Sequence, residues 1–489
     1  MEIPVGLPLK DGTLLRQAML IGGEWVQADS GRTIDVRNPA TGATIARVPD
    51  GGSAETRRAI AAAEAALPSW RRRITKERSV ILRRFYELMI ENVDDLALLI
   101  TTEQGKPLAE GRGEVLYAAG FVDWFAEQAK RTNGDIIPQN LHGRRILVQK
   151  VPVGVFAAIT PWNFPAAMIT RKTAPGWAVG CTGVIKPAKQ TPLTALALGV
   201  LAERAGLPAG VCNVVTGSAS EIGGELTQNP IVRKLSFTGS TGIGALLLEQ
   251  CAPTIKRTSM ELGGNAPFLV FDDADLETAV SAAMVAKYRN SGQSCVGANR
   301  FLVQAGIYDR FAARLAEATQ RLRVGDGTQD NVDVGPLIDE RAVAKVEEHI
   351  ADAVAKGATV AAGGKRHVKG GSFFEPTVLT GVSRDARIFS EETFGPVAPL
   401  FHFETEEEGV ALANDTPFGL ASYLCARDLG RVFRVSEALD FGMVGVNEGL
   451  ISTEVAPFGG VKASGLGREG SHYGIEEYLE TKYIALGGL

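Results

Sequence analysis

One of the five cysteines stands in a setting suited to nucleophilic chemistry. Cys295 closes the stretch Ser291-Gly292-Gln293-Ser294, whose small residues can display a side chain on a flexible, strained turn. A thiolate there would attack a carbonyl carbon readily. Because free cysteines are mostly buried structural residues, a structural thiol is the alternative that residue type alone leaves open.

Two further polar residues have settings that fit acyl chemistry. Glu261 ends an apolar stretch and precedes Gly263-Gly264, so its carboxylate is expected to face a cleft, where partial desolvation raises a carboxyl pKa toward that of a general base. Asn163 offers an amide N–H to a developing oxyanion, as the backbone N–H of Cys295 does. A solvated surface carboxylate and a turn asparagine are the ordinary alternatives.

A glycine-rich turn is a candidate phosphate site. Residues 237–244 read Phe-Thr-Gly-Ser-Thr-Gly-Ile-Gly, between an apolar strand pattern and a helical pattern. Gly239 and Ser240 lie where the backbone can approach an anion and the N–H groups of a helix start favour phosphate. The spacing differs from the GxGxxG fingerprint, and the chain holds 56 glycines, so an ordinary strand-to-helix turn remains open.

These residues must be positioned by secondary-structure elements, and the type of element that the sequence predicts changes along the chain. Alternating apolar runs over residues 21–49 predict hairpins at a sheet edge. A helix is predicted from Ser53 to a break at Pro68, and a second helix is indicated by the helical spacing of Ile81, Phe85, Leu88 and Met89. These first elements are interpreted as scaffold.

From Val151 onward, short apolar strands alternate with helical stretches, which predicts a parallel, doubly wound sheet. The expected strands are residues 153–159, 183–186, 212–215 and 235–237. Another apolar run, 267–271, opens a second series that continues past Phe441. The fold class is therefore α/β, with two doubly wound units packed closely and a cleft between them.

Composition narrows the class of protein. The 489 residues are 45% hydrophobic and 22% charged, as in globular proteins that fold around a large core. A net charge of -5 provides no basic field for nucleic acid. Scattered cysteines and histidines predict neither a disulfide framework nor a catalytic metal. No long apolar run or signal-like start is present, so we expect no membrane partner and a cytoplasmic location.

Several motifs, taken in order, resemble the aldehyde dehydrogenase superfamily. The similarity runs from Asn38-Pro39-Ala40-Thr41-Gly42 nearly to the C-terminus. The motifs that carry it are Thr160-Pro161-Trp162-Asn163-Phe164-Pro165, Ile185-Lys186-Pro187-Ala188, Met260-Glu261-Leu262-Gly263-Gly264-Asn265, Gly292-Gln293-Ser294-Cys295, Glu392-Thr393-Phe394-Gly395-Pro396 and Pro457-Phe458-Gly459-Gly460. As an ordered set they are far more specific than any one of them.

The resemblance implies a mechanism and an architecture. Cys295 would form a thiohemiacetal and then a thioester, Asn163 would hold the oxyanion, and Glu261 would activate the hydrolytic water. The chain would divide into a cofactor-binding domain (1–130 and 150–260), a catalytic domain (261–469) and bridging segments that join subunits (131–149 and 470–489). A homotetramer or homodimer is expected.

The cofactor implied by the resemblance is NADP or NAD. The residues expected to bind it are Thr160, Trp162, Lys186, Lys189, Gly239, Ser240, Glu392 and Phe394. Many NAD-preferring relatives carry a Glu three positions after the equivalent of Lys186, and this chain has Lys189. A cation there would pair with a 2′-phosphate, which favours NADP. If Lys189 instead points to solvent, both cofactors are accepted.

Within the family, the chain resembles succinate-semialdehyde dehydrogenase and its near relatives. The stretches 168–172, 288–290 and 449–452 carry this likeness, and they place Arg171, Arg289 and Ser452 as ligands of a remote substrate carboxylate. A guanidinium fork suits a carboxylate. Internal salt bridges, or a helix-surface charge at Arg171, are the alternatives. Gly297 stands where several relatives carry a second, redox-active cysteine, so no disulfide switch is expected there.

Other activities remain open. Glutarate semialdehyde and 2-oxoglutarate semialdehyde would also suit a site with two arginines and a serine. A CoA-acylating enzyme would use the same thioester, but a general base at Glu261 favours hydrolysis. A non-catalytic structural relative is disfavoured because Cys295, Glu261 and Asn163 are all present.

Overall fold

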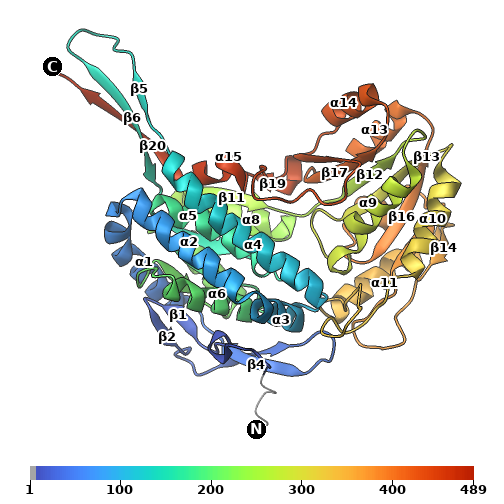
Figure 1. Cartoon of the computed structure of the whole chain (residues 1–489), viewed down its shortest axis with the longest axis horizontal. Coiled ribbons are helices and arrows are strands. Elements are labelled where there is room, and N and C mark those ends of the chain that lie inside the picture. The colour runs from blue at the N-terminus through green and yellow to red at the C-terminus, as the bar shows by residue number, and fades with distance from the viewer. Residues whose placement is uncertain (1–6, 489) are drawn as a thin grey trace.

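The computed structural model describes residues 7–488, so the outermost ends of the segments predicted from 1 and to 489 lie outside the described residues. Two large sheets, of eight and seven strands, carry most of the chain, and a three-stranded sheet and a two-stranded sheet complete it. In Figure 1 the eight-stranded half and the seven-stranded half lie side by side, and the three-stranded sheet projects from the first half as an arm.

The eight-stranded sheet has the order β19-β11-β10-β7-β8-β9-β1-β2. Its strands are β1 (Met19–Ile21), β2 (Glu24–Val26), β7 (Val155–Ile159), β8 (Thr182–Lys186), β9 (Cys212–Val214), β10 (Val232–Thr238), β11 (Arg257–Glu261) and β19 (Gly465–Leu466). The five strands β7 to β11 are parallel. Chain order reverses between the neighbours β7 and β10, which is the switch point where doubly wound folds bind ligands.

Helices cover both faces of this sheet because its central strands, β7 and β8, are buried along nearly their whole length. Val155 and Ala157 pack with helices of one face, while Phe156 and Ala158 join the core of the other. The first face holds α1 (Ser53–Arg72), α7 (Ala219–Gln228) and α8 (Thr241–Cys251). The second holds α5 (Ala167–Val179) and α6 (Pro192–Arg204), with α2 (Thr75–Glu91), α3 (Val93–Gln104) and α4 (Leu108–Gln128) packed behind them.

The seven-stranded sheet has the order β14-β15-β16-β13-β12-β17-β18 and is parallel except for β14. Its strands are β12 (Ala266–Val270), β13 (Ala298–Gln304), β14 (Thr359–Ala362), β15 (Thr377–Thr380), β16 (Val397–Phe403), β17 (Ala421–Cys425) and β18 (Met443–Val446). Its helices are α9 (Leu276–Tyr288), α10 (Tyr308–Gln320), α11 (Glu340–Ala355), α12 (Arg387–Ser390), α13 (Glu406–Asn414) and α14 (Leu429–Ala438). Phe268 packs with α9 and α10, and Leu269 with α11 and α13 on the opposite face.

Two smaller sheets lie outside these units. The arm pairs β6 (Arg145–Pro152) with β5 (Asp135–Ile137) on one side and β20 (Leu479–Leu486) on the other. A short helix, α15 (Ser471–Glu476), precedes β20. The hairpin β3 (Thr33–Arg37) and β4 (Thr44–Pro49) forms the two-stranded sheet. The strand β19, from the segment 261–469, returns to pair with β11 of the eight-stranded sheet.

The predicted α/β class with two parallel sheets is confirmed, and so are the early hairpins, β1–β2 and β3–β4. The predicted helix break at Pro68 is wrong, since α1 continues to Arg72. The fully buried Trp70 anchors the last turn, and Glu64, whose carbonyl loses its partner at Pro68, lies at the exposed surface where water can solvate it. Within residues 7–488, no helix is both long and apolar enough to cross a bilayer.

Candidate functional site

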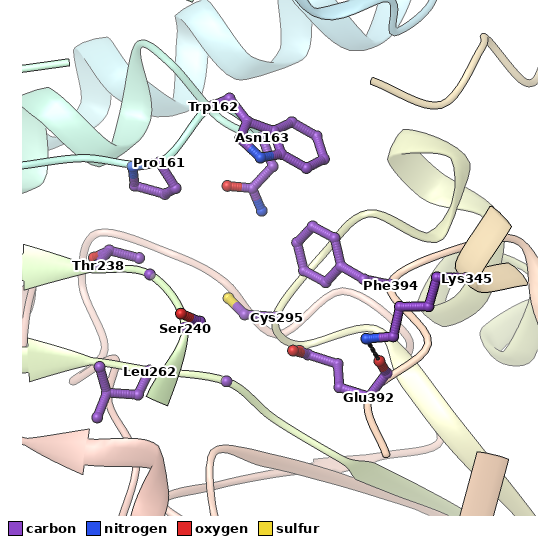
Figure 2. Close-up of a pocket in the computed structure, with 12 residues that line it drawn as sticks. Pro161, Trp162, Asn163, Thr238, Ser240, Leu262, Cys295, Lys345, Glu392 and Phe394 are labelled. Carbon is purple, nitrogen blue, oxygen red and sulfur yellow. Dashed lines mark hydrogen bonds between the residues drawn. The ribbon is translucent and has the colours of Figure 1, made fainter. Parts of the chain in front are cut away.

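A cavity of about 270 Å³ opens at the switch point of the eight-stranded sheet and reaches the loops of the other large unit. The turns that follow β7 and β10 supply one wall, and the segments before β13 and β16 supply the other. Figure 2 shows the Cys295 sulfur, the Asn163 amide and the Glu392 carboxylate around the same space. The residues that line it are Pro161, Trp162, Asn163, Thr238, Gly239, Ser240, Leu262, Gly263, Cys295, Lys345, Glu392 and Phe394.

The nucleophile candidate follows a strained turn. Asn290, Ser291 and Gly292 have consecutive φ values of 54°, 57° and 73°, in the left-handed region. The Asn290 N–H donates to Glu110 Oε2 at 2.8 Å, and the Ser291 hydroxyl donates to the Gly335 carbonyl at 3.0 Å. Cys295 is partly exposed, whereas the other four cysteines are buried. The predicted strained display of Cys295 is thus what the backbone shows.

Backbone segments approach each other closely around Cys295. A Cβ atom added to Gly264 would lie 2.4 Å from the Cys295 carbonyl oxygen. Another added to Gly459 would lie 2.9 Å from Glu261 Oε1. Two of the glycine-containing motifs therefore meet at the candidate site, where side chains would not fit.

Burial keeps the Cys295 thiol protonated in the structure as it stands. Burial raises the pKa of Cys295 to about 12; Glu392 and Glu261 add to this shift and Arg171 opposes it. A base is therefore needed to produce the thiolate, because attack requires that form.

Glu261 has the burial expected of a base. It ends β11 with 2% of its surface exposed, and neither carboxylate oxygen has a hydrogen-bond partner among residues 7–488. Burial, followed by the Glu469 carboxylate, raises the pKa of Glu261 well above its ordinary value of 4.5, against the charges of Arg171 and Lys172. In its ionised form, Glu261 has two unpartnered oxygens that can accept a proton from water or a thiol, although Glu261 is not among the residues that line the cavity.

Asn163 lies in the turn between β7 and α5 with 3% of its surface exposed. Its Nδ2 donates one hydrogen to the Gln293 carbonyl at 3.1 Å. An amide nitrogen carries two hydrogens, so the second remains for an oxygen in the cavity. Asn163 therefore bridges the β7 turn to the segment that carries Cys295.

The cavity wall opposite Asn163 is formed by the residues before β16. Glu392 Oε1 accepts from the Gly264 N–H at 3.1 Å, and burial raises the pKa of Glu392 to about 7. Phe394 meets Trp162 edge to face, with ring centroids 5.6 Å apart. Lys345 Nζ donates to the Glu392 carbonyl at 2.5 Å. This combination of a carboxylate and aromatic rings suits a sugar hydroxyl beside a flat heterocycle.

Of the remaining predicted cofactor residues, Gly239 and Ser240 line the cavity after β10. Thr160, Lys186 and Lys189 lie at the carboxyl ends of β7 and β8, outside the lining. The Thr160 N–H donates to the Lys186 carbonyl at 3.1 Å. Lys186 is 6% exposed, and burial together with the charge of the exposed Lys189 lowers the pKa of Lys186 to about 8. Ser240 precedes α8 without a side-chain cap, leaving backbone N–H groups for an anion. These features fit a dinucleotide laid across the switch point.

A second, narrow pocket meets the first at Cys295. It is lined by Tyr117, Phe164, Met168, Arg171, Arg289, Ser294, Cys295, Val296, Ser452 and Phe458. The structure thus brings the three predicted carboxylate ligands to one place beside the thiol. Its free space is about 20 Å³, room for a water molecule, so a longer ligand needs movement of the lining side chains.

The two arginines of this pocket differ in pairing. Arg171 is 2% exposed, forms an ion pair with Glu469, and lies over the Phe458 ring at 4.3 Å. The alternative of an internal salt bridge therefore applies to Arg171, although its Nη2 has no hydrogen-bond partner within residues 7–488. Arg289 forms no ion pair with any described residue and lies over the Phe164 ring at 5.1 Å.

Two side chains of these pockets lie far from every motif that the sequence reasoning used. Lys345 comes from the middle of α11, far from any of the motifs. Tyr117 comes from α4, and its buried hydroxyl has no hydrogen-bond partner among the described residues. Both occupy helical positions with no local signal in the sequence, so only the tertiary structure places them.

Comparisons with known proteins show the family of this chain. The aldehyde dehydrogenase family profile matches residues 25–484. A glutarate-semialdehyde dehydrogenase of Pseudomonas aeruginosa is 63% identical over 99% of this chain and all of that protein. A succinate-semialdehyde dehydrogenase [NADP(+)] of Escherichia coli is 62% identical over 98% of this chain and 100% of that protein.

The fold agrees with a solved structure as well. The crystal structure of a succinate-semialdehyde dehydrogenase from Burkholderia pseudomallei has a TM-score of 0.98 and 61% identity, covering 98% of this chain and 100% of that one. The resemblance and the fold class expected from the sequence motifs are confirmed, and this chain belongs to the aldehyde dehydrogenase family.

Proposed function

We propose that this aldehyde dehydrogenase oxidises the semialdehyde of a short dicarboxylic acid, first of all succinate semialdehyde, to the diacid. The observation that carries the proposal is the pocket where Arg171, Arg289 and Ser452 lie beside Cys295. The Arg289 guanidinium forms no ion pair within residues 7–488, and Nη2 of Arg171 has no hydrogen-bond partner there, so both are donors that a carboxylate would satisfy. Relatives named for succinate and glutarate semialdehydes have similar identities, so glutarate semialdehyde remains a candidate beside 2-oxoglutarate semialdehyde.

In the proposed reaction, the Cys295 thiolate adds to the aldehyde carbon and the carbonyl electron pair moves to oxygen. The free Nδ2 hydrogen of Asn163 and the Cys295 N–H stabilise that oxyanion. The bound nicotinamide supplies a hydride acceptor. Loss of hydride leaves a thioester on Cys295. Glu261 then takes a proton from water as the water oxygen adds to the thioester carbon. The C–S bond breaks, the acid is released, and the Cys295 thiolate takes up the proton that Glu261 holds.

The cofactor proposed is NADP or NAD, with NADP favoured. Glu392 and Phe394 would hold the nicotinamide riboside end, with Trp162 across the cavity. Gly239 and Ser240 would hold the pyrophosphate at the start of α8. Thr160 and Lys186 would lie along the adenosine end, and the exposed Lys189 is available to a 2′-phosphate.

The domain roles follow the same scheme. Segments 1–130 and 150–260 would bind the cofactor, 261–469 would carry catalysis, and 131–149 with 470–489 would join subunits into a homodimer or homotetramer. Exposed apolar residues on the arm, including Ile136 and Tyr483, support the last role. We place the enzyme in the cytoplasm, acting on a small molecule.

The substrate proposal is tested with Arg289→Leu, Arg171→Leu and Ser452→Ala. If the arginines hold the carboxylate, each Leu variant should lose about 2–5 kcal/mol in kcat/KM for succinate semialdehyde, the scale for truncating a buried charge pair. An uncharged aldehyde of the same length should be affected much less. Equal losses on both aldehydes would contradict the role. Arg289→Leu is the cleaner variant, since Arg171→Leu also leaves Glu469 unpaired.

Two further measurements test the length of the substrate's carbon chain and the identity of the nucleophile. A kinetic panel of succinate, glutarate and 2-oxoglutarate semialdehydes with each cofactor would rank the candidates. Cys295→Ala should abolish turnover while cofactor binding is kept. Substantial aldehyde oxidation by that variant would show that the nucleophile is another residue.

A further inference from the structure

We infer that Lys106, together with its ion-pair partner Glu114, is a positioning residue that fixes the Asn163 amide relative to the Cys295 thiol. The inference rests on the proposed roles of Asn163 and Cys295. Neither Lys106 nor Glu114 lines the cavity, and neither belongs to the motifs that carry the family resemblance.

Lys106 lies in the link between α3 and α4 and is 1% exposed. Its Nζ is 2.5 Å from Glu114 Oε2 and donates to the Asn163 carbonyl at 2.8 Å. The Phe164 ring centroid lies 4.0 Å from the same nitrogen. The ammonium group therefore contacts two consecutive residues of the Asn163 turn, and its charge is compensated by one carboxylate.

Glu114 holds the other end of that turn. Its Oε1 accepts from the Ala166 N–H at 2.8 Å and lies 3.3 Å from the Ala167 nitrogen, where α5 begins. The Lys106–Glu114 pair thus forms hydrogen bonds to the turn on both sides of Phe164 and Pro165. A turn held in this way has little freedom to rotate the Asn163 peptide.

Asn163 is also held by Asn290, which belongs to the segment that carries Cys295. Asn290 Nδ2 donates to the Asn163 carbonyl at 3.0 Å and to the Gln293 carbonyl at 3.0 Å. The Asn163 carbonyl thus accepts from Lys106 and Asn290 together, which uses both of its lone pairs. Asn290 is in turn held by Glu110, one helical turn before Glu114 on α4. Two carboxylates on one face of α4 therefore set the spacing between the oxyanion donor and the nucleophile.

A double-mutant cycle tests this inference because it separates action through Asn163 from general damage. Lys106→Met should slow single-turnover hydride transfer by about 10- to 100-fold, the scale of a small misplacement at a reaction centre. Binding of the oxidised cofactor should be unchanged. In an Asn163→Ala background, the same substitution should cost less than about threefold, since the group that Lys106 positions is already gone.

Lys256→Met is the matched control. Lys256 is also buried, at 8% exposure, and its Nζ donates to the carbonyls of Asn229 and Val232, each at 2.9 Å, away from the cavity. It should lower thermal stability without slowing hydride transfer. Glu114→Gln, which removes the charge that compensates Lys106, is the second variant and should show the same dependence on Asn163.

Three results would overturn the inference: an equal loss in both backgrounds, no loss for Lys106→Met, or an equal loss for Lys256→Met. Failure of both Lys106→Met and Glu114→Gln to fold would make the pair purely structural and overturn it too. Wild-type enzyme is measured first with succinate semialdehyde and with an uncharged aldehyde. Lack of turnover on either would contradict the proposed function itself, whereas turnover with additive variants would contradict only the positioning role.

Discussion

Burial controls the protonation of the two side chains proposed to carry the chemistry. Both Cys295 and Glu261 have a raised pKa, so each favours its neutral form. The neutral thiol and the neutral carboxyl are both unreactive: loss of a proton from Cys295 creates the nucleophile, and loss of a proton from Glu261 creates the base. The nearby Arg171 charge favours that loss in both groups.

A pH dependence follows for deacylation. If the Glu261 carboxylate activates water, the deacylation rate should rise with pH through an apparent pKa well above the ordinary value of 4.5, because the inactive acid form persists up to that pKa. Rapid-quench measurement of thioester decay over a series of pH values from 4.5 upward checks this. Glu261→Gln should accumulate the acyl-enzyme and lose this pH limb. Decay that is independent of pH would contradict the role.

Cofactor choice is predicted to depend on one exposed charge. Lys189→Glu should weaken NADP binding by like-charge repulsion with the 2′-phosphate, by about 1 kcal/mol in a solvated setting, and should spare NAD. Titration of each cofactor against intrinsic fluorescence measures both constants. Lys189→Gln is the control that removes charge without repulsion. Unchanged binding of both cofactors would place the phosphate elsewhere.

The candidate residues that sequence reasoning found are those whose neighbours carry a signal. Cys295, Glu261 and Asn163 each stand among glycine or proline residues that the backbone needs there, as the close approach at Gly264 shows. Tyr117 and Lys345 lie on helices without such neighbours, whereas Lys106 stands between Gly105 and Pro107, a signal that the sequence reasoning did not use. Their contacts are set by how α4 and α11 pack on distant segments, which local spacing does not reveal.

At the level of elements, apolar runs located most strands correctly because buried parallel strands are apolar on both faces. Strand ends differed by one to three residues, as at β9, which ends at Val214, and at β10, which begins at Val232. The helix break at Pro68 was predicted wrongly because the general effect of proline on helices takes no account of tertiary packing. Here the buried Trp70 holds the last turn of α1 in place. The ion pair between Arg171 and Glu469 could not be predicted from the local sequence either, since 298 positions separate the two residues.

The link from β11 to β12 is predicted to tolerate no side chain at Gly264. Gly264→Ala would drive a methyl group against the Cys295 carbonyl, and the backbone shift should cost about 1–3 kcal/mol and slow acylation. Thermal unfolding and single-turnover rates measure both effects. Gly113→Ala in α4, where an added Cβ meets nothing within 4 Å, is the control and should not slow acylation. Normal acylation in Gly264→Ala would contradict the prediction, because it would show that the Cys295 backbone can move away from the added methyl group without loss of activity.

At the scale of the whole molecule, the arm contributes little to the core of its own subunit. The strand β20 pairs with β6 along eight residues, from Leu479 opposite Pro152 to Leu486 opposite Arg145. Its far edge has no strand partner among residues 7–488. Ile136 is 80% exposed and Tyr483 60% exposed. Such an edge with apolar side chains invites pairing with another chain.

We therefore predict that charges on the arm break the assembly while leaving the subunit folded. Burying either side chain against a second copy would contribute roughly 1.5–3 kcal/mol, so Ile136→Lys with Tyr483→Lys should raise the dissociation constant by more than about 100-fold. Light scattering after size exclusion should then show a smaller species, with helix content unchanged by circular dichroism. Val368→Lys, at a residue 91% exposed on a loop of the other unit, is the control and should keep the wild-type mass. A monomeric wild-type protein, or a double variant of unchanged mass, would contradict the bridging role, because an exposed edge that joins no subunits gives a lysine nothing to disrupt.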